Sequence, residues 1–150
     1  MRIKADITGI ASAVVRIRDG ARIDGGLKLY ANGRLARYCE PYVPASSAKL
    51  LAMPSAITEE YVQYRGPYAH YQYMGEVYGP NIPITENGMI VGYFSPPGKP
   101  KTKTDRKLQY SHDVHPLAQS HWDQAAMVRH LGDLEDDIGG FIERRINDGE

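Results

Sequence analysis

The chain has 150 residues, of which 42% are hydrophobic and 24% are charged, as is usual for a single globular domain. Its 18 basic and 18 acidic residues give a formal net charge of zero, which argues against a general nucleic-acid binder, because such proteins need many cations to neutralise phosphates. The single cysteine, Cys39, cannot form an intramolecular disulfide, which argues against a secreted, disulfide-stabilised scaffold.

The first predicted element is a strand at the N-terminus. Ile3, Ala5 and Ile7 alternate with polar residues, so they would share one face of an extended segment. The opening residues lack the apolar core of a signal peptide, and no apolar run in the chain is long enough to span a membrane. We therefore expect the chain to fold and act in a reducing cytoplasm, or in an assembly built there.

An amphipathic helix is predicted from about Ile23 to Tyr42. Apolar residues recur there at steps of three and four, which is the spacing of one helix face. These residues are Ile23, Leu27, Tyr30, Ala31, Leu35, Tyr38 and Tyr42. Cys39 lies near this face, where a buried structural thiol is expected, and Pro41 marks the end of the helix.

Tyrosines dominate the stretch from Tyr61 to Gly79, YVQYRGPYAHYQYMGEVYG, which holds six of the 11 tyrosines in the chain. A strand is predicted over Ile57 to Tyr64, and the whole stretch is predicted to form two short extended pieces joined by a turn at Gly66-Pro67. Tyrosine suits both a half-buried strand and a surface that docks onto another protein. The expected subunit-interface residues are Tyr64, Tyr68, Tyr71, Tyr73 and Tyr78.

A predicted hairpin then leads into a basic loop. Asn87-Gly88 favours a tight turn, so residues 84–94 are predicted to form the hairpin. Residues 95–106, SPPGKPKTKTDR, have no apolar side chain to bury, so we expect a mobile, exposed loop, followed by a short strand around Leu108 and Tyr110. The candidate docking residues of this loop are Lys99, Lys101, Lys103 and Arg106.

A second amphipathic helix is predicted after a connector at residues 112–119. Ser120 and Asp123 have the spacing of a capping box, which places the helix start there. The apolar positions that follow are Trp122, Ala126, Leu131, Leu134, Ile138, Phe141, Ile142 and Ile146. The acidic run at 135–137 and the pair Arg144-Arg145 are expected to face away from the core.

The order strand, helix, several strands, helix predicts a single α+β domain over residues 1–150. We expect a central antiparallel sheet flanked by an N-terminal helix and a C-terminal helix.

The histidines are the main candidates for chemistry, because imidazole and nearby carboxylates bind divalent metals. The cluster comprises His112, His115, His121 and His130, with Asp113 and Asp123 beside it. Its spacing matches no zinc motif, and no nucleophile elbow is evident. We therefore expect no catalytic residue, cofactor or metal. Two alternatives stay open: a metal-dependent enzyme using the 112–130 cluster, and a nucleic-acid-binding module using the basic segment 99–107.

Three segments of the chain form one pattern. The first segment has Tyr42-Val43-Pro44 followed by a small-residue turn and Leu50. The second has Pro67-Tyr68-Ala69 leading into Tyr71, Tyr73 and Gly75. The third has Leu108 and Tyr110, with Pro116, Ala118 and Trp122 opening the last helix. In this order the segments resemble the minor capsid proteins of tailed bacteriophages, which are related to the tail-completion proteins of the phage neck. Related proteins usually carry Thr-Gly or Ser-Gly after Tyr-Val-Pro, whereas this chain has Ala45-Ser46-Ser47-Ala48.

The resemblance implies a structural virion protein of the head–tail connector, with no catalytic residues and no cofactor. Such proteins form a ring beneath the portal and help to join the DNA-filled head to the tail. We expect a six-fold ring, which matches tail symmetry, ahead of a twelve-fold ring, which matches the portal. The expected partners are further copies of the chain and neighbouring neck, portal-adaptor and tail proteins. Passing contact with genomic DNA stays open, and no membrane partner is expected.

Overall fold

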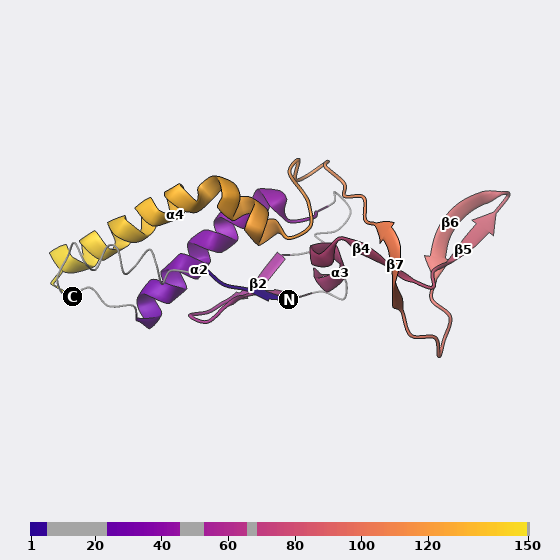
Figure 1. Ribbon diagram of the computed structural model, residues 1–150, viewed down its shortest axis with the longest axis horizontal. Helices are drawn as coiled ribbons and strands as arrows, with labels where there is room; N and C mark the ends of the chain where they lie inside the picture. Colours follow the sequence, from indigo (N-terminus) through magenta and orange to yellow (C-terminus); the bar gives the residue numbers. More distant parts are fainter. Residues whose placement is uncertain (6–23, 46–52, 66–68, 150) are drawn as a thin grey trace.

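The computed structural model describes residues 1–5, 24–45, 53–65 and 69–149 (Figure 1). In chain order the elements are β1 (Arg2–Ile3), α2 (Gly25–Cys39), the 3₁₀ helix η1 (Glu40–Tyr42), β2 (Met53–Ile57), β3 (Val62–Arg65), α3 (Ala69–Met74), β4 (Glu76–Gly79), β5 (Ile82–Glu86), β6 (Met89–Phe94), β7 (Thr102–Lys107) and α4 (Trp122–Asn147). The predicted α+β class, with an N-terminal and a C-terminal helix, is confirmed. The antiparallel strands are divided over three small sheets, β1-β3-β2, β4-β7 and β5-β6.

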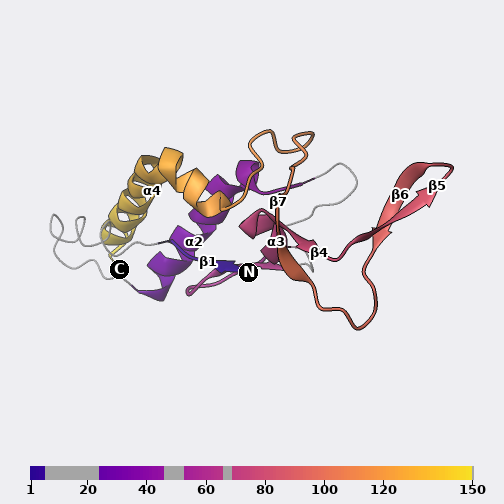
Figure 2. The same ribbon diagram turned by 45° about the vertical axis from the view of Figure 1, so that its right-hand side comes forward.

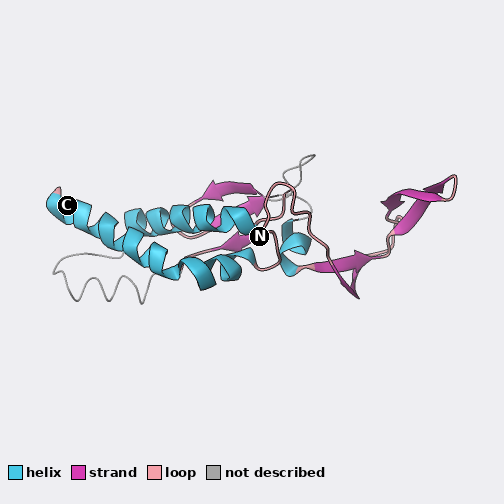
Figure 3. Cartoon of the chain, turned by 90° about the horizontal axis from the view of Figure 1, so that it is seen from above, coloured by secondary structure: helices cyan, strands magenta, loops and turns pink. Residues whose placement is uncertain are grey.

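Helices α2 and α4 lie side by side and run in opposite directions (Figure 1, Figure 3). The apolar residues between them form one buried cluster: Leu27 and Ala31 from α2, and Leu134, Ile138 and Ile142 from α4. Within each helix these residues recur at steps of four, so each helix presents one continuous stripe to the other. The predicted apolar faces are therefore confirmed in their main part, although Leu131 is 46% exposed and lies outside the seam.

Polar side chains tie the two helices together at both ends of this seam. Asp24 caps α2 by accepting a hydrogen bond from the Leu27 N–H (2.9 Å), and its carboxylate also accepts two hydrogen bonds from Arg145 of α4 (2.6 and 3.0 Å). Arg34 of α2 donates to Asp137 of α4 (2.7 Å). The prediction that Asp137 and Arg145 face away from the core is therefore wrong, because the antiparallel pairing brings each of them to an opposite charge on α2.

The three-stranded sheet packs against the helix pair, with β3 as its central strand. Val62 and Tyr64 of β3 are buried together with Leu35 and Cys39 of α2, so the predicted burial of the thiol is confirmed. The predicted strand over residues 57–64 is wrong in its middle. A turn separates β2 from β3, and it is closed by the Thr58 backbone N–H, which donates a hydrogen bond to the Tyr61 carbonyl (2.9 Å).

The tyrosine-rich stretch does contain two extended pieces, β3 and β4, but the prediction that a turn alone joins them is wrong. Residues 69–74 form the short helix α3, while the predicted turn residues 66–68 lie outside the described part of the chain. Gly75, at φ +73°, ends α3 in the left-handed conformation that glycine favours at a helix C-terminus. A Cβ at this position would lie 2.7 Å from the Ser120 side chain, so any larger residue at position 75 would also clash with Ser120.

The basic loop is shorter than predicted. Residues 102–107 form β7, which pairs antiparallel with β4, so Lys103 and Arg106 belong to a strand. The strand predicted around Leu108 and Tyr110 is wrong, because β7 ends at Lys107. Of the predicted N-terminal strand, Arg2–Ile3 forms β1 and Ile7 lies outside the described residues.

The predicted Asn-Gly hairpin is confirmed and forms an arm. Strands β5 and β6 are joined by Asn87 and Gly88, whose positive φ values of 50° and 78° are those that a tight primed turn requires. The arm projects from the end of the molecule opposite the C-terminus of α4, in both of two views (Figure 1, Figure 2).

Helix α4 begins at Trp122, and the predicted Ser120–Asp123 capping box is wrong. The residue before the helix, His121, has a left-handed backbone (φ 48°) and makes no side-chain cap. Asp123 instead accepts a hydrogen bond from the Tyr73 hydroxyl (2.8 Å), so its carboxylate ties α4 to α3.

The seam can be tested with two leucines that differ in burial. Leu134→Ala is expected to lower the free energy of unfolding by about 2–5 kcal/mol, because it leaves a cavity between α2 and α4. Leu29→Ala is the control, since Leu29 lies on α2 and is 44% exposed, and it should change this free energy by about 0.5 kcal/mol or less. Urea denaturation followed by far-UV circular dichroism measures both, and equal effects would contradict the assigned seam.

The ion pair at the end of the seam predicts a pH dependence. The Arg145 guanidinium, together with the Leu27 N–H, lowers the pKa of Asp24 from its usual 3.8 to about 2. A lowered carboxyl pKa stabilises the fold above the unfolded-state value and ceases to do so as pH falls through the folded-state value. Asp24→Asn keeps the helix cap but removes the charge. In this variant the free energy of unfolding should therefore fall less steeply between pH 4 and pH 2 than in the wild type. An unchanged slope in acid titrations would refute this role for the pair.

Candidate interaction surface

The β5-β6 arm exposes large apolar side chains that no other part of the described chain covers. At least 40% of each of these side chains is exposed: Ile82, Ile84, Met89, Ile90, Val91, Tyr93 and Phe94. A two-stranded hairpin is at best marginally stable alone in water, and clustered exposed apolar side chains mark sites that contact other molecules. The arm is therefore the part of the described chain that most needs a partner.

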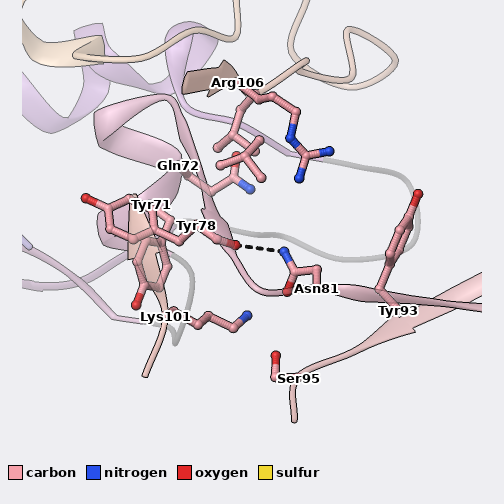
Figure 4. A pocket seen from close by; sticks show the side chains of 10 residues that line it. Tyr71, Gln72, Tyr78, Asn81, Tyr93, Ser95, Lys101 and Arg106 are labelled. Atoms are coloured by element: carbon pink, nitrogen blue, oxygen red, sulfur yellow. Dashed lines mark hydrogen bonds between the residues drawn. The ribbon is translucent and has the colours of Figure 1, made fainter. Parts of the chain in front are cut away.

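A cavity of about 480 Å³ lies where the arm joins the body (Figure 4). Tyr71 and Tyr78 form one wall, with ring centroids 4.7 Å apart, and Tyr93 of the arm faces them across the opening. Lys101 and Arg106 also line the cavity, and no carboxylate does. The cavity therefore combines aromatic rings with positive charge, which suits a partner that carries an acidic group beside apolar surface.

Four of the five tyrosines predicted at an interface lie in the described residues, and these four are divided between the core and this cavity. Tyr64 is only 1% exposed and packs edge-on against Trp122 (5.2 Å), so its predicted interface role is wrong. Tyr73 also packs against Trp122 (5.0 Å), and its hydroxyl binds Asp123, so its ring serves the fold. Burial, and then the hydrogen bond to Asp123, raise the pKa of Tyr73.

The other three tyrosines have separate outcomes. Tyr71 and Tyr78 are partly exposed in the cavity, where the interface prediction stays a prediction. Tyr68 lies outside the described residues. The predicted hairpin contains Met89, Ile90 and Val91, but the sequence predicted no partner role for them and did not show that both faces of the hairpin are exposed.

The predicted docking cations also separate into two groups. Lys103 and Lys107 both bind the Glu76 carboxylate (2.8 and 3.1 Å), which is 7% exposed, and these contacts hold the pKa of Glu76 below its usual range. Lys103 therefore serves the β4-β7 sheet. Lys101 and Arg106 face the cavity, and Lys99 is exposed in the connection between β6 and β7.

The histidine cluster of the sequence is dispersed in the fold. The Nδ1 atom of His115 lies 2.7 Å from the Val43 carbonyl oxygen, and that of His130 lies 2.8 Å from the Asp133 carboxylate. His121 precedes α4, and His112 is exposed in the connector. Within the described ranges, no group of three or more His, Cys, Asp or Glu side chains is placed to hold a metal ion.

Comparison of the chain with family models, curated proteins and solved structures found no match. Among the helices that the structure describes, none is both long and apolar enough to cross a membrane.

The division of the tyrosines can be tested by two single substitutions. Tyr73→Ala should lower the free energy of unfolding by about 1–3 kcal/mol, because it removes a ring packed on Trp122 and a hydrogen bond to Asp123. Tyr71→Ala should cost about 1 kcal/mol or less, since its ring lines an open cavity. Chemical denaturation at low protein concentration gives both values, and a larger loss for Tyr71→Ala would place that ring in the core.

Proposed function

We propose that the chain is a structural subunit of a bacteriophage head–tail connector, where it forms a ring with copies of itself between the head and the tail. The observation that carries this proposal is the exposed apolar arm, which supports a protein that works by assembly. The resemblance of the sequence to phage minor capsid and tail-completion proteins supports the place of that assembly. Neighbouring neck, portal-adaptor and tail proteins would be the further partners.

The energetics of the arm favour a closed ring over an isolated dimer. Burying about 40 Å² on each of its exposed apolar side chains would contribute roughly 1 kcal/mol per side chain. Association costs roughly 4–15 kcal/mol in lost translational and rotational freedom, so one arm contact gives weak binding. In a closed ring each subunit donates one arm and receives another, and the last contact forms within an assembly that already exists.

The arm also has the geometry of a connecting element. It lies at one end of an elongated molecule, well away from the α2-α4 seam (Figure 1, Figure 2). Its partner can therefore bind without disturbing the core of the subunit. A contact of this kind joins two different surfaces, and repeated contacts of one type close into a ring when the rotation per subunit permits.

The proposal predicts that the arm is needed for assembly and not for folding. The triple variant Ile84→Ser, Ile90→Ser, Phe94→Ser should remain folded but stay monomeric at concentrations where the wild type forms rings, because the apolar contact area is lost. Light scattering after size-exclusion chromatography measures the mass, and negative-stain electron microscopy shows whether rings form.

The matched control replaces three apolar side chains of similar exposure outside the arm. Leu29, Ile57 and Ile146 are 44%, 41% and 37% exposed, and changing all three to Ser should leave ring formation intact. A monomeric wild type under all conditions, or rings formed by the arm variant, would contradict the proposed role of the arm.

A further inference from the structure

The outer face of α4 is complementary to the arm in its chemistry. Val128 is 90% exposed and Leu131 is 46% exposed, which gives this face an apolar patch. Glu135 and Asp136 follow within two turns and are also exposed. Residues 128, 131 and 135 share one side of the helix, since they are spaced by three, four and seven. The face thus presents an apolar patch followed by negative charge.

The arm and its cavity present features in the same order, an apolar patch followed by charge, but the charge has the opposite sign. Ile90 and Tyr93 of β6 are both exposed, and Tyr93 also lines the cavity together with Lys101 and Arg106 (Figure 4). Within the described part of the chain, Lys101 and Arg106 have no carboxylate at ion-pair distance, and neither Glu135 nor Asp136 has a cation there. Both pairs of charges are available to a partner.

We infer that the arm of one copy docks on the outer face of α4 of the next copy. Ile90 and Tyr93 pack on Val128 and Leu131, and the acidic residues that follow reach the cations of the cavity. This inference rests on the proposed ring and names the two surfaces that form it. The occupant of the arm and its cavity is a second copy of this chain.

The spacing of the two surfaces agrees with this docking. From Val128 to Glu135 the helix rises roughly 10 Å, at about 1.5 Å per residue. From Ile90 to Tyr93 the strand covers roughly 10 Å, at about 3.3 Å per residue, and the cavity begins at Tyr93. An arm laid along the helix can therefore place its apolar side chains and its cations against matching groups together.

Two observations favour a second copy over other occupants. The arm and the body that carries α4 lie toward opposite ends of the elongated molecule, so the contact is between chains (Figure 1). Nucleic acid would match Lys101 and Arg106, but it would leave the apolar side chains of the arm uncovered, and the chain has a net charge of zero. A protein surface with both an apolar patch and acidic groups covers both features.

The test is a charge exchange across the inferred contact. Arg106→Glu and Glu135→Arg should each raise the dissociation constant for self-association by about tenfold or more, because each places like charges together. The chain carrying both substitutions should return to within about threefold of the wild type, since opposite charges then face each other again. Sedimentation velocity of the full chain over a concentration series, at low salt, measures these constants.

The control is Lys99→Glu, which reverses a charge in the connection just before β7 but outside the cavity, and it should leave the constant within about twofold of the wild type. Unchanged association of both single variants, or a double variant as weak as the singles, would overturn the docking while leaving the ring and the connector proposal in place. Arg106→Glu that associates normally but loses binding to a fluorescent single-stranded oligonucleotide would also overturn it, and would assign the cavity to nucleic acid. Failure of the connector proposal itself would show differently, as a wild-type chain that does not self-associate.

Discussion

The antiparallel seam between α2 and α4 is the interaction on which the rest of the structure depends. It buries Leu27 and Leu134 almost completely and is closed at one end by the Asp24–Arg145 pair. Trp122, at the start of α4, carries the same packing into the sheet through Tyr64 and into α3 through Tyr73. The three-stranded sheet and α3 are thus connected to the seam by buried contacts.

Because the body closes on itself, the arm is left free for association. Its two strands pair antiparallel, with one register shift between Ile84 and Thr85, yet no helix or third strand in the described chain covers either face. An uncovered apolar hairpin is a liability for a protein that acts alone, since its edges and side chains promote unwanted contacts. In a subunit of a larger assembly the same feature supplies the contact, which is why the proposed function follows from this element and from no reactive group.

The helices could be predicted from the sequence because their packing follows a simple period. The apolar residues of each helix, such as Leu27 in α2 and Ile138 in α4, recur at helical spacing. Their burial along one stripe then stabilises the helix. The hairpin could be predicted because Asn87-Gly88 sets its turn through local backbone preference. In both cases the deciding physics lies within a few residues of the feature itself.

The remaining elements depend on contacts between distant residues. Tyrosines favour strands locally, but residues 69–74 form α3, in which the Tyr73 ring packs on Trp122 and Gly75 ends the helix. The strand β7 has a sequence typical of a loop, yet Lys103 and Lys107 have a carboxylate partner in Glu76 of β4. The cavity likewise joins the basic segment to tyrosines about 30 residues away, and no local pattern predicts which rings or cations would face it.

The most direct test of the connector proposal is to look for the chain in purified particles of the bacteriophage in which that proposal places it. Gold-labelled antibody against the chain, viewed by electron microscopy, would show where it lies. The account predicts label confined to the junction between head and tail. Particles that lack the chain, or that carry label elsewhere on the head or tail, would contradict the proposal that it is a connector subunit.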